Sequence, residues 1–101
     1  MMDRCTKPNI FFILTDQMRS TAMGCAGVEN IETPNLDRLA AEGTRFANAV
    51  ANTPACSPSR ASLLTGLHVL SHGVINNEIQ VKLGTCTLAG SLRDNGYKCG
   101  Y

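Results

Sequence analysis

Short apolar runs alternate along this chain with stretches that carry helix caps and helical spacing. The run 10–14 is unbroken and lies between Pro8 and Asp16, which predicts a strand buried on both faces of a parallel sheet. The segment 44–51 is a second strand candidate, and a third strand is predicted to begin at Tyr97. Strands separated by helices predict an α/β fold.

Capping residues predict a helix between Thr33 and Gly43. Thr33 is a suitable N-cap, Pro34 suits the first helical position, and Gly43 suits the end. A shorter helix is predicted to begin at Thr87 and to end at 95–96, which reads Asn-Gly. The segment 18–31, which contains Gly24 and Gly27, is predicted to be a connecting loop, and 67–86 lacks a sustained period and is predicted to be mostly loop.

A further helix is predicted within the stretch 56–66, which reads CSPSRASLLTG. Ser57 is a suitable N-cap, Pro58 suits the first helical position, and Gly66 suits the end. Cys56 then lies just ahead of the positive end of the helix dipole, where backbone N–H groups favour an anion. Arg60, about one turn further on, adds a forked cation suited to a tetrahedral oxyanion.

Charge and composition exclude several classes of protein. A formal net charge of +1 over 101 residues argues against a nucleic-acid partner. The five cysteines include no C-x-x-C pair, which argues against a zinc site or a disulfide framework. The run 10–14 is too short for a signal peptide or a membrane span, so we expect a cytoplasmic chain without a membrane partner.

The pattern C-x-P-S-R at 56–60, followed by L-T-G at 64–66, resembles the signature of the type I sulfatases. The stretches 8–17 and 33–39 are also similar to the opening of that family, so the resemblance covers nearly the whole chain. It implies that 1–101 is the amino-terminal portion of a longer catalytic domain. That domain would have an alkaline-phosphatase-like fold, in which helices sandwich a mixed, mostly parallel sheet.

The resemblance also implies the site. Cys56 would be oxidised to formylglycine, whose hydrate attacks sulfur and later expels sulfate, and Arg60 would be the second catalytic residue. Asp16, Gln17 and position 56 would bind one calcium ion. A carboxylate after a buried strand suits this hard cation, and Gln17 departs from the family's usual second acid but keeps an oxygen ligand. His68 and His72 are expected to be structural or to lie at the rim.

The implied partners are a small-molecule or saccharide sulfate ester and a formylglycine-generating enzyme. Two alternatives stay open: a phosphonate monoester or phosphodiester hydrolase of the same fold, and a non-catalytic truncated remnant. A thiol-based phosphatase needs Cys-x5-Arg, but Ser62 stands at that position, so this class is excluded. The resemblance places further catalytic residues and metal ligands beyond residue 101, so we expect these 101 residues alone to be inactive.

Overall fold

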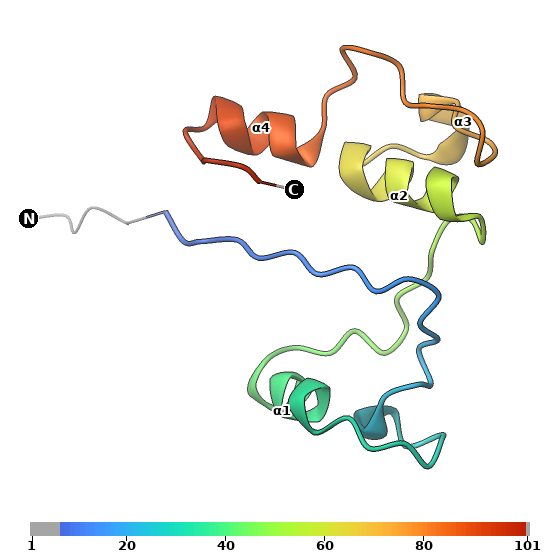
Figure 1. Ribbon diagram of the computed structural model, residues 1–101, viewed down its shortest axis with the longest axis vertical. Helices are drawn as coiled ribbons and strands as arrows, with labels where there is room; N and C mark the ends of the chain where they lie inside the picture. The colour runs from blue at the N-terminus through green and yellow to red at the C-terminus, as the bar shows by residue number, and fades with distance from the viewer. Residues whose placement is uncertain (1–6, 101) are drawn as a thin grey trace, which may run out of the picture. The chain divides into compact units, whose positions relative to one another are not determined.

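The computed structural model of the chain describes residues 7–100 and divides into two compact units, the first ending at Asn48 and the second beginning at Ala49 (Figure 1). The first unit holds a 3-10 helix and an α-helix: η1 (Gly24–Ala26) and α1 (Pro34–Glu42). The second unit holds three α-helices: α2 (Cys56–Thr65), α3 (Val69–His72) and α4 (Leu88–Asp94). None of the helices in residues 7–100 has the length and apolar character that a membrane crossing requires.

The predicted strands do not form within the described residues. The segments 10–14, 44–51 and 97–100 carry no strand, and residue 101 lies outside the described part. A strand is stable only when a neighbour pairs with its backbone and side chains cover its faces. Here Phe11 is 88% exposed and Val50 is 90% exposed, so both apolar runs lack that cover. The structure contradicts these three strands and does not confirm the α/β class.

The first unit is held together by a polar network between η1 and α1. The N-cap residue Thr33 does not cap its own helix with its side chain. Its hydroxyl instead accepts a hydrogen bond from the Gly24 N–H at 2.8 Å and donates to Asp37 Oδ1 at 2.9 Å. The same Asp37 oxygen accepts from the Cys25 N–H at 2.7 Å. These N–H and O–H donors stabilise the carboxylate and lower the pKa of Asp37, the Cys25 N–H most of all.

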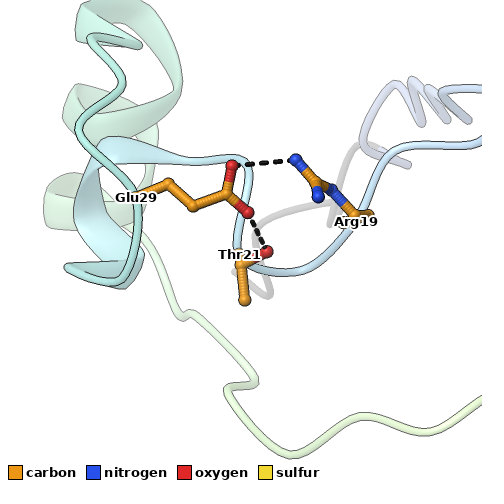
Figure 2. Close-up of polar contacts among 3 residues, drawn as sticks. All are labelled: Arg19, Thr21 and Glu29. Carbon is orange, nitrogen blue, oxygen red and sulfur yellow. Dashed lines mark hydrogen bonds and ion pairs between the residues drawn. The ribbon is translucent and has the colours of Figure 1, made fainter.

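A second polar cluster joins the segment before η1 to the segment after it (Figure 2). Glu29 accepts from Arg19 Nη2 at 2.8 Å and from the Thr21 hydroxyl at 2.5 Å, one bond to each carboxylate oxygen. The Arg19 side chain is 71% exposed, so the ion pair is solvated and contributes little stability by itself. The predicted loop 18–31 is therefore an ordered turn with one 3-10 helix inside it.

The second unit is built on the contact between α2 and α3, which lie side by side (Figure 1). Its buried residues are few and lie on α2, at the end of α3 and just after it: Pro58, Ala61, His72 and Val74. Glycines in the left-handed region end both helices, Gly66 at φ 71° and Gly73 at φ 75°. The prediction for 67–86 missed α3, because four residues are too few to show a period.

The helices predicted after Thr33 and after Thr87 are confirmed as α1 and α4. α1 begins at Pro34 directly after Thr33 and ends before Gly43, as the capping residues indicated. α4 follows Thr87, whose hydroxyl accepts a hydrogen bond from the Gly90 N–H at 3.1 Å. This is the bond expected of a threonine N-cap, and it satisfies one donor of the first helical turn.

Candidate functional site

Cys56 is the first residue of α2 rather than the residue ahead of it. The N-cap is Ala55, with φ −81° and ψ 138°, so the predicted N-cap at Ser57 is wrong and Pro58 takes the third helical position. Proline is tolerated there because the first four N–H groups of a helix have no acceptor within the helix. The Ser59 N–H makes a helical bond back to Ala55 O at 3.0 Å.

The start of α2 receives a side-chain acceptor from a distant loop. Asn77 Oδ1 accepts a hydrogen bond from the Ser57 N–H at 3.0 Å and lies 3.2 Å from Cys56 Sγ, which donates to it. Sequence reasoning did not find Asn77. Its residue type is a common cap, but nothing local in the sequence tells which helix a loop asparagine will cap.

The start of α2 has fewer N–H groups available to bind an anion than the sequence predicted. The Ser57 N–H already donates to Asn77, and Pro58 has no N–H to offer. Two positions of the first turn are therefore closed to an incoming anion. The thiol of Cys56 is free and exposed, and Arg60 is exposed four residues further along the same helix. Residues four apart share a helix face, so α2 carries the two predicted catalytic residues on one side.

The predicted metal ligands Asp16 and Gln17 belong to the first unit, whereas Cys56 belongs to the second. Both follow the extended segment 10–14, and Gln17 has φ 52°, an uncommon left-handed conformation for a residue other than glycine. Carboxylate and amide oxygens are donors that calcium accepts, so the two residues fit part of its shell of six to eight ligands. Residues 7–100 contain no cluster of three His, Cys, Asp or Glu side chains that could hold a metal ion.

The two histidines have structural contacts. His72 is buried, its Nδ1 accepts from the Val74 N–H at 3.1 Å, and its Nε2 lies 2.8 Å from Ser62 Oγ. Because Nδ1 accepts, the neutral ring carries its proton on Nε2 and donates it to Ser62. In this tautomer the ring does not take a proton from the serine, so the pair is not an activated nucleophile. His68 is exposed and its Nδ1 accepts from the Leu70 N–H at 3.4 Å, at the start of α3.

Comparison with known proteins places the chain in a family. The family model described as Sulfatase matches residues 8–101. The chain is 46% identical to the "Ulvan-active sulfatase" of Formosa agariphila and 47% identical to the "Arylsulfatase" of Clostridium perfringens, over 98% and 90% of its length. It is 35% identical over 93% of its length to the "N-acetylgalactosamine-6-O-sulfatase" of Bacteroides thetaiotaomicron.

These matches cover 19% of each of the three relatives, so the chain spans about a fifth of their length. No solved structure matches the chain. The family match extends over all but the first seven of the 101 residues and includes both the segment around Asp16 and the motif at 56–66. This chain belongs to the sulfatase family.

Proposed function

We propose that this chain supplies the nucleophile-bearing part of a sulfuric ester hydrolase that cleaves a sulfate monoester. The observation that carries the proposal is the C-x-P-S-R motif of a sulfatase-family chain, presented at the start of α2 with a free, exposed Cys56. An exposed thiol is accessible to a formylglycine-generating enzyme, whereas a buried one would first require local unfolding. The names of two relatives, "Ulvan-active sulfatase" and "N-acetylgalactosamine-6-O-sulfatase", favour a sulfated saccharide as the substrate class.

Formylglycine at position 56 would supply a hydrated aldehyde: one hydroxyl would attack sulfur and displace the alcohol, and the second would then lose its proton and expel sulfate, which regenerates the aldehyde. Arg60 is exposed and lies about one turn further along the same helix. Its guanidinium would bind a sulfate oxygen through two N–H groups and orient the sulfur toward position 56. Because the backbone of one helical turn is rigid, it fixes the distance between the Cα atoms of these two residues.

Asp16 and Gln17 would hold a calcium ion through one carboxylate and one amide oxygen, with further ligands from outside this pair. A bound calcium ion would supply positive charge that stabilises the charge developing on the sulfate oxygens. The donor chemistry of this pair supports the assignment, and so does its position after the apolar run 10–14.

The deciding experiment is peptide mass spectrometry of the Cys56 peptide after expression of the longest reading frame with a formylglycine-generating system. Replacing CH2–SH by CHO lowers the mass by about 18 Da, as expected for a nucleophile made by oxidation of cysteine. The peptides with Cys86 and Cys99, which are also free and exposed, are the internal controls and should keep their mass. Sulfatase activity in a protein whose Cys56 stays unmodified would overturn the mechanism.

Substrate screening then separates the proposal from its alternatives. A panel of aryl sulfates, sulfated saccharides, phosphonate monoesters and phosphodiesters distinguishes sulfur from phosphorus chemistry. Turnover limited to the phosphorus esters would favour the related hydrolase of the same fold. Absence of both modification and turnover would favour the non-catalytic remnant.

A further inference from the structure

We infer that Asn77 is a positioning residue for the side chain at position 56. One oxygen, Asn77 Oδ1, accepts from two donors in the first turn of α2: the Ser57 N–H at 3.0 Å and the Cys56 thiol at 3.2 Å. The loop that carries Asn77 thereby contacts the motif helix at the residue on which the chemistry depends. This inference goes beyond the family signature, which ends at Gly66.

The chemistry of the donors determines the orientation of the amide. The Ser57 N–H can only donate, so the atom that faces it must be the carbonyl oxygen of Asn77 and not its NH2 group. Cys56 Sγ lies within reach of that same oxygen, so the thiol points its hydrogen at Asn77. Both contacts therefore depend on a single acceptor atom, and replacing that atom removes both.

The start of α2 packs through the buried Pro58 but has no local side-chain cap for its N–H groups. Its N-cap is Ala55, which has no side-chain acceptor, and its third residue Pro58 has no N–H. Asn77, twenty residues after Ser57, performs the role that a serine or asparagine N-cap usually performs locally. A cap from a distant loop differs from a local one because it ties the position of that loop to the direction of the Cys56 side chain.

The role of the Asn77 contact in catalysis rests on the proposed function, in which the side chain at position 56 becomes the nucleophile. A side chain that must attack a bound ester needs a defined direction, since misplacing a reacting group by about 1 Å can lower the rate about a hundredfold. Asn77 limits the directions available to the Cys56 thiol, and after modification the hydroxyls of the hydrated aldehyde would be the donors for the same oxygen. Asn76, the neighbouring residue, accepts from the Glu78 N–H at 3.0 Å in a local turn, so it offers a matched control.

The test is the rate at which iodoacetamide alkylates Cys56 in the full chain, followed by peptide mass spectrometry. We expect Asn77→Ala to raise this rate roughly fivefold, the factor that corresponds to one hydrogen bond of ordinary net strength. Asn77→Asp keeps an oxygen acceptor and should alkylate no faster than the parent. Asn76→Ala should leave the rate at Cys56 unchanged.

Cys86 and Cys99 are exposed cysteines of the same unit and serve as references in every variant. A rise at Cys56 alone supports positioning, whereas an equal rise at all three cysteines would show that Asn77 only stabilises the unit. An unchanged rate in Asn77→Ala, or an equal effect of Asn76→Ala, would also overturn the inference. The measurement uses the unmodified thiol, so its outcome does not depend on whether Cys56 becomes formylglycine.

Discussion

The imidazole of His72 and the hydroxyl of Ser62 lie 2.8 Å apart, and their hydrogen bond joins α3 to the motif helix α2. His72 is 5% exposed and the neighbouring Val74 is 1% exposed, so the bond lies in the small core of the second unit. Through Nδ1 the same ring also accepts the Val74 N–H. One imidazole therefore satisfies a side chain of α2 and a buried backbone donor.

Replacement of His72 by alanine should destabilise the second unit by about 1–3 kcal/mol, because the buried Val74 N–H loses its acceptor. Hydrogen exchange of the Val74 amide, and of the α2 amides, measures the loss. His68→Ala is the control, because His68 is exposed and its bond to the Leu70 N–H is long at 3.4 Å. Equal acceleration of exchange in the two variants would contradict the role assigned to His72.

The three longer helices, α1, α2 and α4, were predictable because their signals are local, apart from the exact start of α2. Pro34 at the start of α1, Thr87 before α4 and Gly66 after α2 each act within one turn of the helix that they begin or end. The three strands predicted at 10–14, 44–51 and from Tyr97 are wrong, because strand formation depends on pairing with segments far away in sequence. The run 10–14 has the composition of a buried strand, yet Phe11 is 88% exposed and no strand pairs with the run in residues 7–100.

In the candidate site too, residues within a local motif could be predicted from the sequence, whereas a contact between distant residues could not. Cys56 and Arg60 are predicted from a motif of fixed spacing, and both are exposed residues of one helix. Asn77 could not be found in this way, because its contact with Cys56 spans 21 residues. The helix start was misplaced because proline favours the first position but is tolerated throughout the first turn, and Pro58 takes the third.

Stability of the η1 and α1 pairing should fall in acid. Hydrogen bonds from the Cys25 N–H and the Thr33 hydroxyl hold the pKa of Asp37 below its ordinary value of 3.8. A depressed pKa in the folded state means that the unfolded chain takes up the proton first as the pH falls. The contribution of Asp37 is therefore complete above pH 3.8 and is lost as the pH drops through its lower folded pKa.

An NMR titration of the Cys25 amide proton measures this transition. Asp37→Asn keeps an oxygen acceptor but has no carboxyl group to titrate, so the Cys25 amide shift should be flat over the same pH range. Asp94→Asn, an exposed acid on α4 in the other unit, is the control and should leave the Cys25 titration as in the parent. A Cys25 titration that persists in Asp37→Asn would disprove the assignment.

Substitution of Gly66 by alanine should destabilise the end of α2 by about 1–2 kcal/mol, the cost of placing an L-residue with a Cβ in the left-handed region. The new Cβ would meet no atom within 4 Å, so the cost arises from the backbone and not from a clash. Gly66→Asn should cost less, because asparagine tolerates this conformation. Urea unfolding of each variant gives the free energy difference.

Gly100→Ala is the matched control for that series. A Cβ at Gly100 also meets open space, and the backbone there is not in the left-handed region. It should therefore leave the free energy of unfolding within about 0.5 kcal/mol of the parent. If Gly66→Ala were no more destabilising than Gly100→Ala, the left-handed end of α2 would not be a requirement of the fold.

The proposed role of Asp16 as a calcium ligand is tested by the calcium dependence of activity, measured on the protein expressed from the longest reading frame. Removal of the ion with a chelator should abolish hydrolysis of a sulfate ester, and added calcium should restore it. Asp16→Asn removes the charge of one oxygen ligand, which lowers affinity for a hard cation, so the calcium concentration for half-maximal activity should rise at least about tenfold. Asp94→Asn is the control, because it removes an exposed carboxylate outside the proposed ligand pair. A parent-like calcium requirement in Asp16→Asn, measured beside direct calcium titration by calorimetry, would assign Asp16 to turn formation after the extended segment instead.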